Sequence, residues 1–121
     1  MKLQDQVISL ELAKNLKELG VKQDSLFYWW KPIDGDWILV EKKEQDEGYQ
    51  MEGRAFSAFT VAELGEMLPC DFVSGKDISE KFCCWSESNT IVLDFIEFAK
   101  TEANARAKML IYLINNNLIS Y

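Results

Sequence analysis

The clearest structural signal in the chain lies in residues 26–42, which run Leu26-Phe-Tyr-Trp-Trp-Lys-Pro-Ile33, Asp34-Gly35, Asp36-Trp-Ile-Leu-Val-Glu-Lys42. Two runs rich in aromatic and β-branched residues on either side of an Asp-Gly pair predict a β-hairpin with a tight type I′ turn. Proline cannot donate a hydrogen bond to a neighbouring strand. Pro32 therefore indicates that the first strand is an edge strand or ends there.

A second hairpin is predicted over residues 79–98. The runs 81–86 and 90–98 are rich in residues that favour strands, and Glu87-Ser88-Asn89 supplies the turn between them. The polar, glycine-punctuated residues 41–54 predict a loop, with room for a short strand around Tyr49–Met51.

An amphipathic helix is predicted over residues 7–19, where leucines recur at helical spacing. Gly20 follows at the position where a left-handed residue commonly ends a helix. Asp5 and Ser9 can each serve as the N-cap, and we favour Asp5.

A short helix is predicted over residues 59–69. Thr60 and Glu63 have the spacing of a capping box, and Phe59 and Leu64 that of a hydrophobic staple. Pro69 ends the helix after Leu68. A helix this short needs tertiary packing, for which we expect these residues: Val61, Leu64 and Leu68.

A third helix is predicted from Thr101, as the N-cap, to about Asn116. The negative charge of Glu102 interacts favourably with the positive end of the helix dipole. An asparagine of the run 115–117 can adopt the left-handed conformation that ends a helix. Its expected core stripe consists of Ala103, Ala107, Leu110 and Ile114.

We therefore expect one domain of the α+β class, covering residues 1–121. In it, two hairpins build a small antiparallel sheet of about four strands, with three helices packed mainly on one face. The strand order stays open.

Composition limits the chemistry that the chain can perform. Its 121 residues include no histidine, and 13 basic against 20 acidic residues give a net charge of −7. Without histidine there is no Ser–His or Cys–His nucleophile pair and no histidine-bound zinc. We therefore expect a protein that is not an enzyme and that uses neither a metal nor a cofactor.

The acidic charge is concentrated in residues 63–97, which carry eight acids and two bases, a local charge of −6. Binding to a phosphate backbone depends on clustered lysine and arginine, so no nucleic-acid partner is expected. This segment is either a solvated surface or a docking face for a basic partner.

The chain contains three cysteines: Cys70, Cys83 and Cys84. A disulfide-stabilised small protein usually has a larger and even number of cysteines. We expect reduced thiols and a cytoplasmic protein. The first residues carry charge where a signal peptide requires an apolar run, and no apolar run of membrane-spanning length occurs, so no membrane association is expected.

The aromatic run 27–30, with Trp37 across the turn, is the most conspicuous candidate for a functional surface. Alternation along a strand sends Phe27 and Trp29 to one face and Tyr28 and Trp30 to the other. The rings can pack in the core, contact a protein partner or stack on bases, although Asp34 and Asp36 oppose the last option. The candidate partner-contact residues are Tyr28, Trp30 and Trp37.

Three blocks of the chain, Ser9–Gly20, Ala58–Pro69 and Thr101–Asn117, together resemble small uncharacterised proteins encoded by bacterial phages and prophages. The blocks cover about a third of the sequence. The resemblance implies an intracellular accessory protein of phage or mobile-element origin, and it assigns no catalytic or binding residue.

Three functional hypotheses follow. The first is a non-enzymatic protein-interaction module, with a homodimer as one option, that acts through the aromatic hairpin. The second is an acidic phage-type inhibitor that docks on the basic nucleic-acid-binding site of a host protein through residues 63–97. The third is a carboxylate- or thiol-dependent enzyme, which the missing histidine disfavours.

Overall fold

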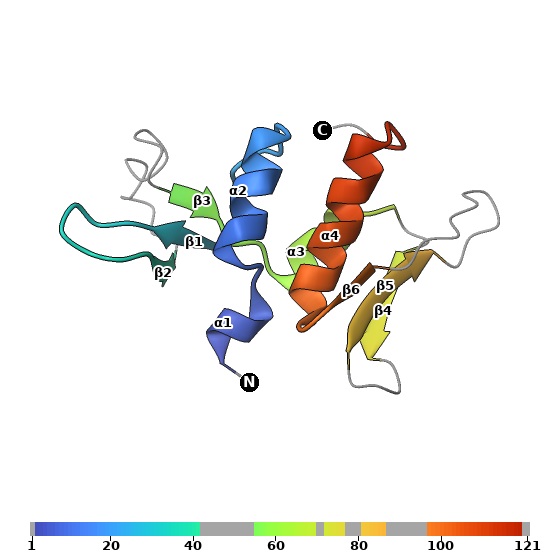
Figure 1. Cartoon of the computed structure of the whole chain (residues 1–121), viewed down its shortest axis with the longest axis horizontal. Helices are drawn as coiled ribbons and strands as arrows, with labels where there is room; N and C mark the ends of the chain where they lie inside the picture. Colours follow the sequence, from blue (N-terminus) through green and yellow to red (C-terminus); the bar gives the residue numbers. More distant parts are fainter. Residues whose placement is uncertain (1, 42–54, 70–71, 77–80, 87–96, 120–121) are drawn as a thin grey trace.

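The computed structural model describes residues 2–41, 55–69, 72–76, 81–86 and 97–119 (Figure 1). Helices and strands follow one another along the chain in this order: α1 (Leu3–Gln6), α2 (Leu10–Glu18), β1 (Phe27–Trp30), β2 (Ile38–Glu41), β3 (Ala55–Ser57), α3 (Val61–Met67), β4 (Phe72–Lys76), β5 (Phe82–Ser86), β6 (Glu97–Ala99) and α4 (Glu102–Asn115). The predicted α+β class is confirmed.

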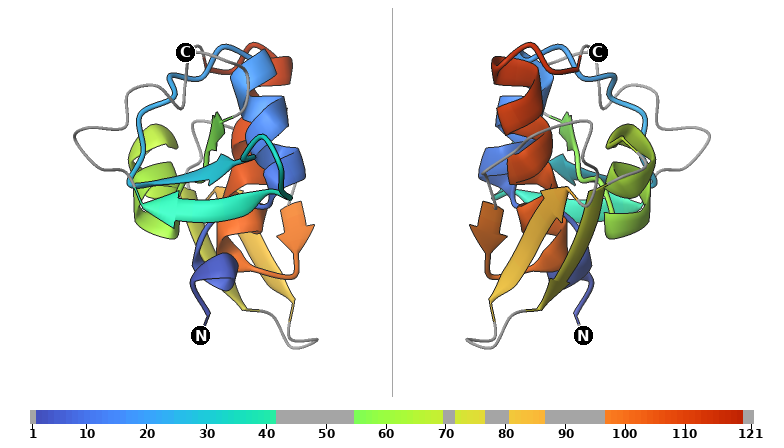
Figure 2. Two further views of the ribbon diagram at one scale, coloured as in Figure 1. Left: turned by 90° about the vertical axis from the view of Figure 1, so that its left-hand side faces the viewer. Right: turned by 90° about the vertical axis from the view of Figure 1, so that its right-hand side faces the viewer.

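The strands form two antiparallel sheets rather than a single one, with the orders β2-β1-β3 and β4-β5-β6. The helices lie between them: α2 packs on β3, and α4 packs on α2, α3 and all strands of the second sheet (Figures 1 and 2). The helices thus separate the two predicted hairpins and cover a sheet on each side.

The first hairpin is confirmed, since β1 pairs with β2 from Phe27↔Glu41 to Trp30↔Ile38. Its turn differs from the prediction, because the strands are joined by residues 31–37 and Gly35 N–H donates to the Pro32 carbonyl at 3.4 Å. Among the described residues only Gly20 and Asn117 have positive φ, so Asp34-Gly35 does not form a type I′ turn. β1 ends just before Pro32 but lies in the centre of its sheet, because β3 pairs with its other edge.

The second hairpin is confirmed in part, since β5 pairs antiparallel with β6. The turn predicted at residues 87–89 and the strand suggested around Tyr49–Met51 lie outside the described residues. The sequence analysis missed β3 and β4. Both are short, and β4 contains Ser74 and Gly75, which favour strands poorly.

The helix predicted over residues 7–19 begins later than expected, at Leu10. Val7 forms a β-bridge with Thr60, and Ile8 N–H donates to the Phe59 carbonyl at 3.0 Å, so this segment is extended. The N-cap of α2 is Ser9, whose hydroxyl accepts from Leu12 N–H at 3.3 Å, and the preference for Asp5 is wrong. Gly20 ends the helix region with a φ of 89°, as predicted.

The other two helices have the predicted ends. Thr60 and Glu63 form the capping box of α3, and Leu68, directly before Pro69, is extended. Thr101 caps α4, and Asn117 follows it with a φ of 57°.

The core is built around α4. Small side chains on this helix let its neighbours approach closely, and most of its surface is buried. Its fully buried residues are Ala103, Ala105, Ala107, Met109, Leu110 and Leu113, and they pack in one cluster with Ile8, Leu16, Phe59, Leu64 and Cys84.

Candidate functional site

The aromatic residues of β1 fix the hairpin to the rest of the molecule from both faces. Trp29 Nε1 donates to the Ile8 carbonyl at 2.9 Å, on the face that it shares with Phe56 across the sheet. On the other face Tyr28 is only 2% exposed, and its hydroxyl donates to the Gln23 carbonyl at 3.3 Å. Tyr28 is therefore part of the core and is not available to a partner in this conformation.

A cluster of aromatic rings and ammonium groups lies where the hairpin meets α2. The rings of Trp37 and Phe56 are 5.5 Å apart and tilted by 45°. Lys14 Nζ lies 5.2 Å from the centre of the Trp37 ring, and Lys17 Nζ lies 5.0 Å from that of Phe56. Both distances are within the range of cation–π attraction. The two α2 lysines therefore border the aromatic rings on this side of the sheet.

A hollow of about 510 Å³ opens beside this cluster, between α1 and the hairpin. Leu3 and Ile38 are 40% and 44% exposed. The described residues that line the hollow are Lys2, Leu3, Gln4, Trp29, Trp37, Ile38 and Leu39. We call Lys2, Leu3, Lys14, Trp37 and Ile38 the hairpin surface.

The lysines at this surface interact with a carbonyl group and with aromatic rings. Lys17 Nζ donates to the Ala55 carbonyl at 3.4 Å, and Lys14 Nζ lies over the rings of Trp37 and Phe56. Within the part of the chain that the structure describes, neither these two lysines nor Lys2 forms an ion pair. The hairpin surface thus contains two lysines without an ion pair among the described residues, in a chain with a net charge of −7.

The three predicted contact residues do not share one surface. Trp37 lies at the hairpin surface, Tyr28 is buried, and Trp30 lies on the Tyr28 face of the sheet and is half-buried. The sequence analysis missed Lys2, Leu3 and Lys14, because only the packing of α1 and α2 against the hairpin brings them to Trp37.

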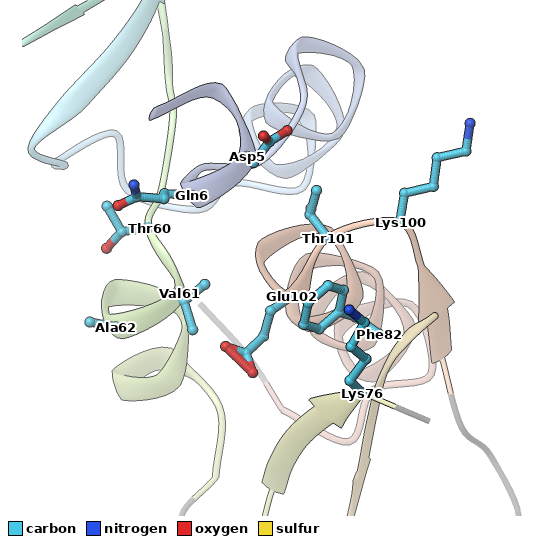
Figure 3. Close-up of a pocket in the computed structure, with 10 residues that line it drawn as sticks. All are labelled: Asp5, Gln6, Thr60, Val61, Ala62, Lys76, Phe82, Lys100, Thr101 and Glu102. Carbon is cyan, nitrogen blue, oxygen red and sulfur yellow. The ribbon is translucent and has the colours of Figure 1, made fainter. Parts of the chain in front are cut away.

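A second, larger cleft of about 700 Å³ opens where α3 and α4 begin, beside α1, β4 and β5 (Figure 3). Lys76 Nζ lies 5.6 Å from the centre of the Phe82 ring. Glu102 points into the space between α3 and β4, whereas Lys100 points away from the other residues shown (Figure 3). Asp5 also lines the cleft, so groups of both signs surround it without converging on one point.

The structure describes the acidic segment 63–97 only in part. The Glu63 carboxylate already accepts two hydrogen bonds within the protein, from Thr60 N–H at 3.0 Å and from Leu26 N–H at 3.1 Å. Glu66 is exposed. The acids outside the described residues are Asp71, Asp77, Glu80, Glu87 and Asp94.

The described cysteines, Cys83 and Cys84, are buried and form no disulfide bond, and Cys70 lies outside the described residues. The described side chains include no group of three or more acids or cysteines arranged to hold a metal ion. None of the described helices has the length and apolar character needed to cross a membrane.

Comparisons with known proteins do not assign a function to this chain. No protein-family model, curated protein or solved structure matches the chain. The resemblance to phage and prophage proteins therefore stays a prediction.

Proposed function

We propose that the protein is a cytoplasmic, non-enzymatic interaction module of the phage accessory type, and that it binds a protein partner through the hairpin surface. One observation carries this proposal. Trp37 and two exposed aliphatic side chains, Leu3 and Ile38, border a hollow beside lysines that form no ion pair with the described residues. Exposed apolar groups gathered in this way commonly mark protein-binding sites.

Chemistry and rigidity support the same proposal. Tryptophan is among the residues that contribute most to binding energy in protein interfaces. The hairpin is held by the Trp29–Ile8 hydrogen bond and by β3 along the far edge of β1. A surface fixed in this way loses little conformational entropy when a partner binds, which favours affinity.

The absence of histidine supports a non-enzymatic role, because imidazole is the usual acid–base group near neutral pH. Cys83 and Cys84 are buried and form no disulfide bond, which supports a cytoplasmic setting. No described feature favours the inhibitor hypothesis over this one, since Glu63 takes part in capping α3.

Site-specific photo-cross-linking tests the proposal. A benzophenone amino acid replaces Ile38 in one version of the full chain and Leu118 in a matched control, because these side chains are 44% and 45% exposed. Irradiation in bacterial cells should give a discrete cross-linked protein from position 38 that disappears when Trp37→Leu is added. Equal products from both positions, or none from position 38, would overturn the proposal.

The homodimer is one form of the proposed interaction. Light scattering coupled to gel filtration measures the mass of the free protein. A dimer that becomes a monomer in the Ile38→Asp variant would identify the partner as a second copy. A monomer at all concentrations would require a different protein as the partner.

A further inference from the structure

We infer that the pair Asp34-Gly35, in the loop between β1 and β2, is a site of spontaneous covalent modification at which the aspartate rearranges to isoaspartate. The reaction goes beyond the proposed function, because it needs neither an enzyme nor a partner. Its substrate is the chain itself, and its co-reactant is water.

The pair lies in an exposed loop that the structure describes in full. Residues 31–37 project from the sheet on the side away from α4 (Figure 1). Asp34 and Gly35 are exposed, and the adjacent Ile33 is 80% exposed. Water therefore reaches both residues of the pair, as the hydrolytic step requires.

Few contacts hold the backbone of the pair in place. Gly35 N–H donates to the Pro32 carbonyl at 3.4 Å, which is longer than the usual N–H···O hydrogen bond. The Asp34 carboxylate forms no hydrogen bond or ion pair with the described residues. An exposed loop with so few contacts opens locally at a small cost in free energy. Asp34 can then turn its carboxyl group toward the Gly35 nitrogen.

The reaction is a condensation followed by a hydrolysis. The Gly35 nitrogen attacks Cγ of the protonated Asp34 carboxyl group, a cyclic succinimide forms, and the amide proton leaves with the hydroxyl group as water. Water then adds to one of the two ring carbonyls. Cleavage of the bond between nitrogen and Cγ restores aspartate, whereas cleavage of the bond between nitrogen and the backbone carbonyl carbon gives isoaspartate. One water is released and one is taken up, so the mass of the chain is unchanged.

The glycine distinguishes Asp34 from the other aspartates of the chain. A residue without Cβ leaves its nitrogen open to the approaching carboxyl group, and its backbone adopts conformations that other residues avoid. Asp36 is exposed in the same loop, but it precedes Trp37, whose ring packs against Phe56. The chain contains no other Asp-Gly pair and no Asn-Gly pair. Asp34 is therefore the expected site, and Asp36 is its internal control.

Incubation of the full chain under native conditions at physiological temperature tests the inference. An isoaspartate methyltransferase with labelled S-adenosylmethionine measures the isoaspartate that forms, and electron-transfer mass spectrometry locates it. We expect isoaspartate to form at least tenfold faster at position 34 than at position 36, a difference of about 1.4 kcal/mol in the barrier. A synthetic peptide of residues 31–37 gives the reference rate without the fold.

Variants at position 34 separate the chemistry from the charge. Asp34→Glu keeps the carboxylate, but its longer side chain would have to close a larger and less favourable ring, so methylation should fall to background. Asp34→Asn should raise the rate, because an amide reacts without first taking up a proton as a carboxylate must.

Three results would overturn the inference. The first is a folded chain without isoaspartate at position 34 while the peptide accumulates it. The second is equal formation at positions 34 and 36, and the third is undiminished methylation of Asp34→Glu.

The modification also has a consequence for the hairpin surface, and this consequence alone rests on the proposed function. Isoaspartate adds a Cβ atom to the main chain three residues before Trp37. It should displace Trp37 from Phe56 and Lys14 and lower the yield of the cross-link from position 38 in the aged chain. Equal yields from the fresh and the aged chain would overturn this consequence. A missing cross-link in the fresh chain would reject the proposed function, while the isoaspartate measurement still decides the modification site.

Discussion

The indole Nε1 of Trp29 donates a 2.9 Å hydrogen bond to the carbonyl oxygen of Ile8, and this bond joins the aromatic hairpin to the N-terminal segment. The Ile8 N–H is used as well, since it donates to the Phe59 carbonyl at 3.0 Å. Both backbone polar groups of this buried residue are therefore paired outside any helix. The hydrogen bonds explain why the chain is extended between α1 and α2.

Replacing Trp29 by phenylalanine removes the donor and leaves the Ile8 carbonyl without it. We expect a loss of about 1–3 kcal/mol in the free energy of unfolding, the cost of an unsatisfied buried group. Urea denaturation measures it. The matched control is Trp37→Phe, because Trp37 forms no hydrogen bond with the described residues. Equal losses in both variants would show that the Trp29–Ile8 bond contributes nothing specific.

Gly65 and Arg106 should be energetically coupled. A Cβ atom at Gly65 would collide with Arg106 Nη1, which donates to the Val61 carbonyl at 3.0 Å, while Nε of the same side chain donates to Ser74 Oγ at 2.7 Å. Gly65→Ala should therefore destabilise the protein, because the disturbed bonds of a charged donor contribute about 1.5–3 kcal/mol each.

The control for this coupling is the same substitution in an Arg106→Ala background. There the collision is gone, and alanine should stabilise α3 by up to about 1 kcal/mol relative to glycine. The change of sign between the two backgrounds is the predicted result in a double-mutant cycle. An equal effect of Gly65→Ala in both would contradict it.

Two buried serines should respond in opposite ways to replacement by alanine. Ser57 Oγ is buried and has no hydrogen-bond partner among the described residues, whereas Ser25 Oγ donates to the Phe27 carbonyl at 2.6 Å. Ser57→Ala should raise the free energy of unfolding or leave it unchanged, and Ser25→Ala should lower it by about 1 kcal/mol. Thermal and urea unfolding measure both. A destabilised Ser57→Ala variant would contradict the assignment of an unsatisfied hydroxyl.

Glu63 should matter more than an ordinary capping residue. Its two carboxylate oxygens accept from Thr60 N–H and Leu26 N–H, so it joins the start of α3 to the segment before β1. Thr60→Ala should cost about 1 kcal/mol, the usual value for an N-cap. Glu63→Ala should cost more, and Glu63→Gln should lie between them, because an amide has only one oxygen acceptor. An unchanged free energy of unfolding in Glu63→Gln would rule out the second bond, because the one oxygen acceptor of the amide can still serve Thr60 N–H.

Local signals predicted much of the fold correctly. The Thr60–Glu63 spacing, Pro69, Thr101 and the asparagine run each act through neighbouring backbone groups, so sequence alone locates the ends of α3 and α4. The hairpin of β1 and β2 was predicted for the same reason.

Non-local contacts explain the errors. The periodic leucines predicted a helix from residue 7, but Val7 pairs with Thr60 and Ile8 with Phe59, more than fifty residues away in the chain. The division into two sheets depends on α4 packing between them. Neither contact leaves a pattern within a window of neighbouring residues.

The candidate site was predicted only in part. Trp37 was found because aromatic residues stand out in the sequence. Lys14 and Leu3 were missed, since the lysine belongs to an ordinary amphipathic helix and the leucine to a single turn. Tyr28 was a reasonable candidate until the structure showed its hydroxyl bonded to the Gln23 carbonyl in the interior.

The location of partner binding is the central claim, and two-dimensional NMR of the ¹⁵N-labelled protein tests it most directly. The protein captured by cross-linking from position 38 is added stepwise while amide and indole signals are followed. The predicted result is a shift of the Trp37 indole and of the Leu3, Lys14 and Ile38 amides, with Val61, Phe82 and Glu102 unchanged. Shifts confined to those last three, which lie at the cleft of Figure 3, would contradict it.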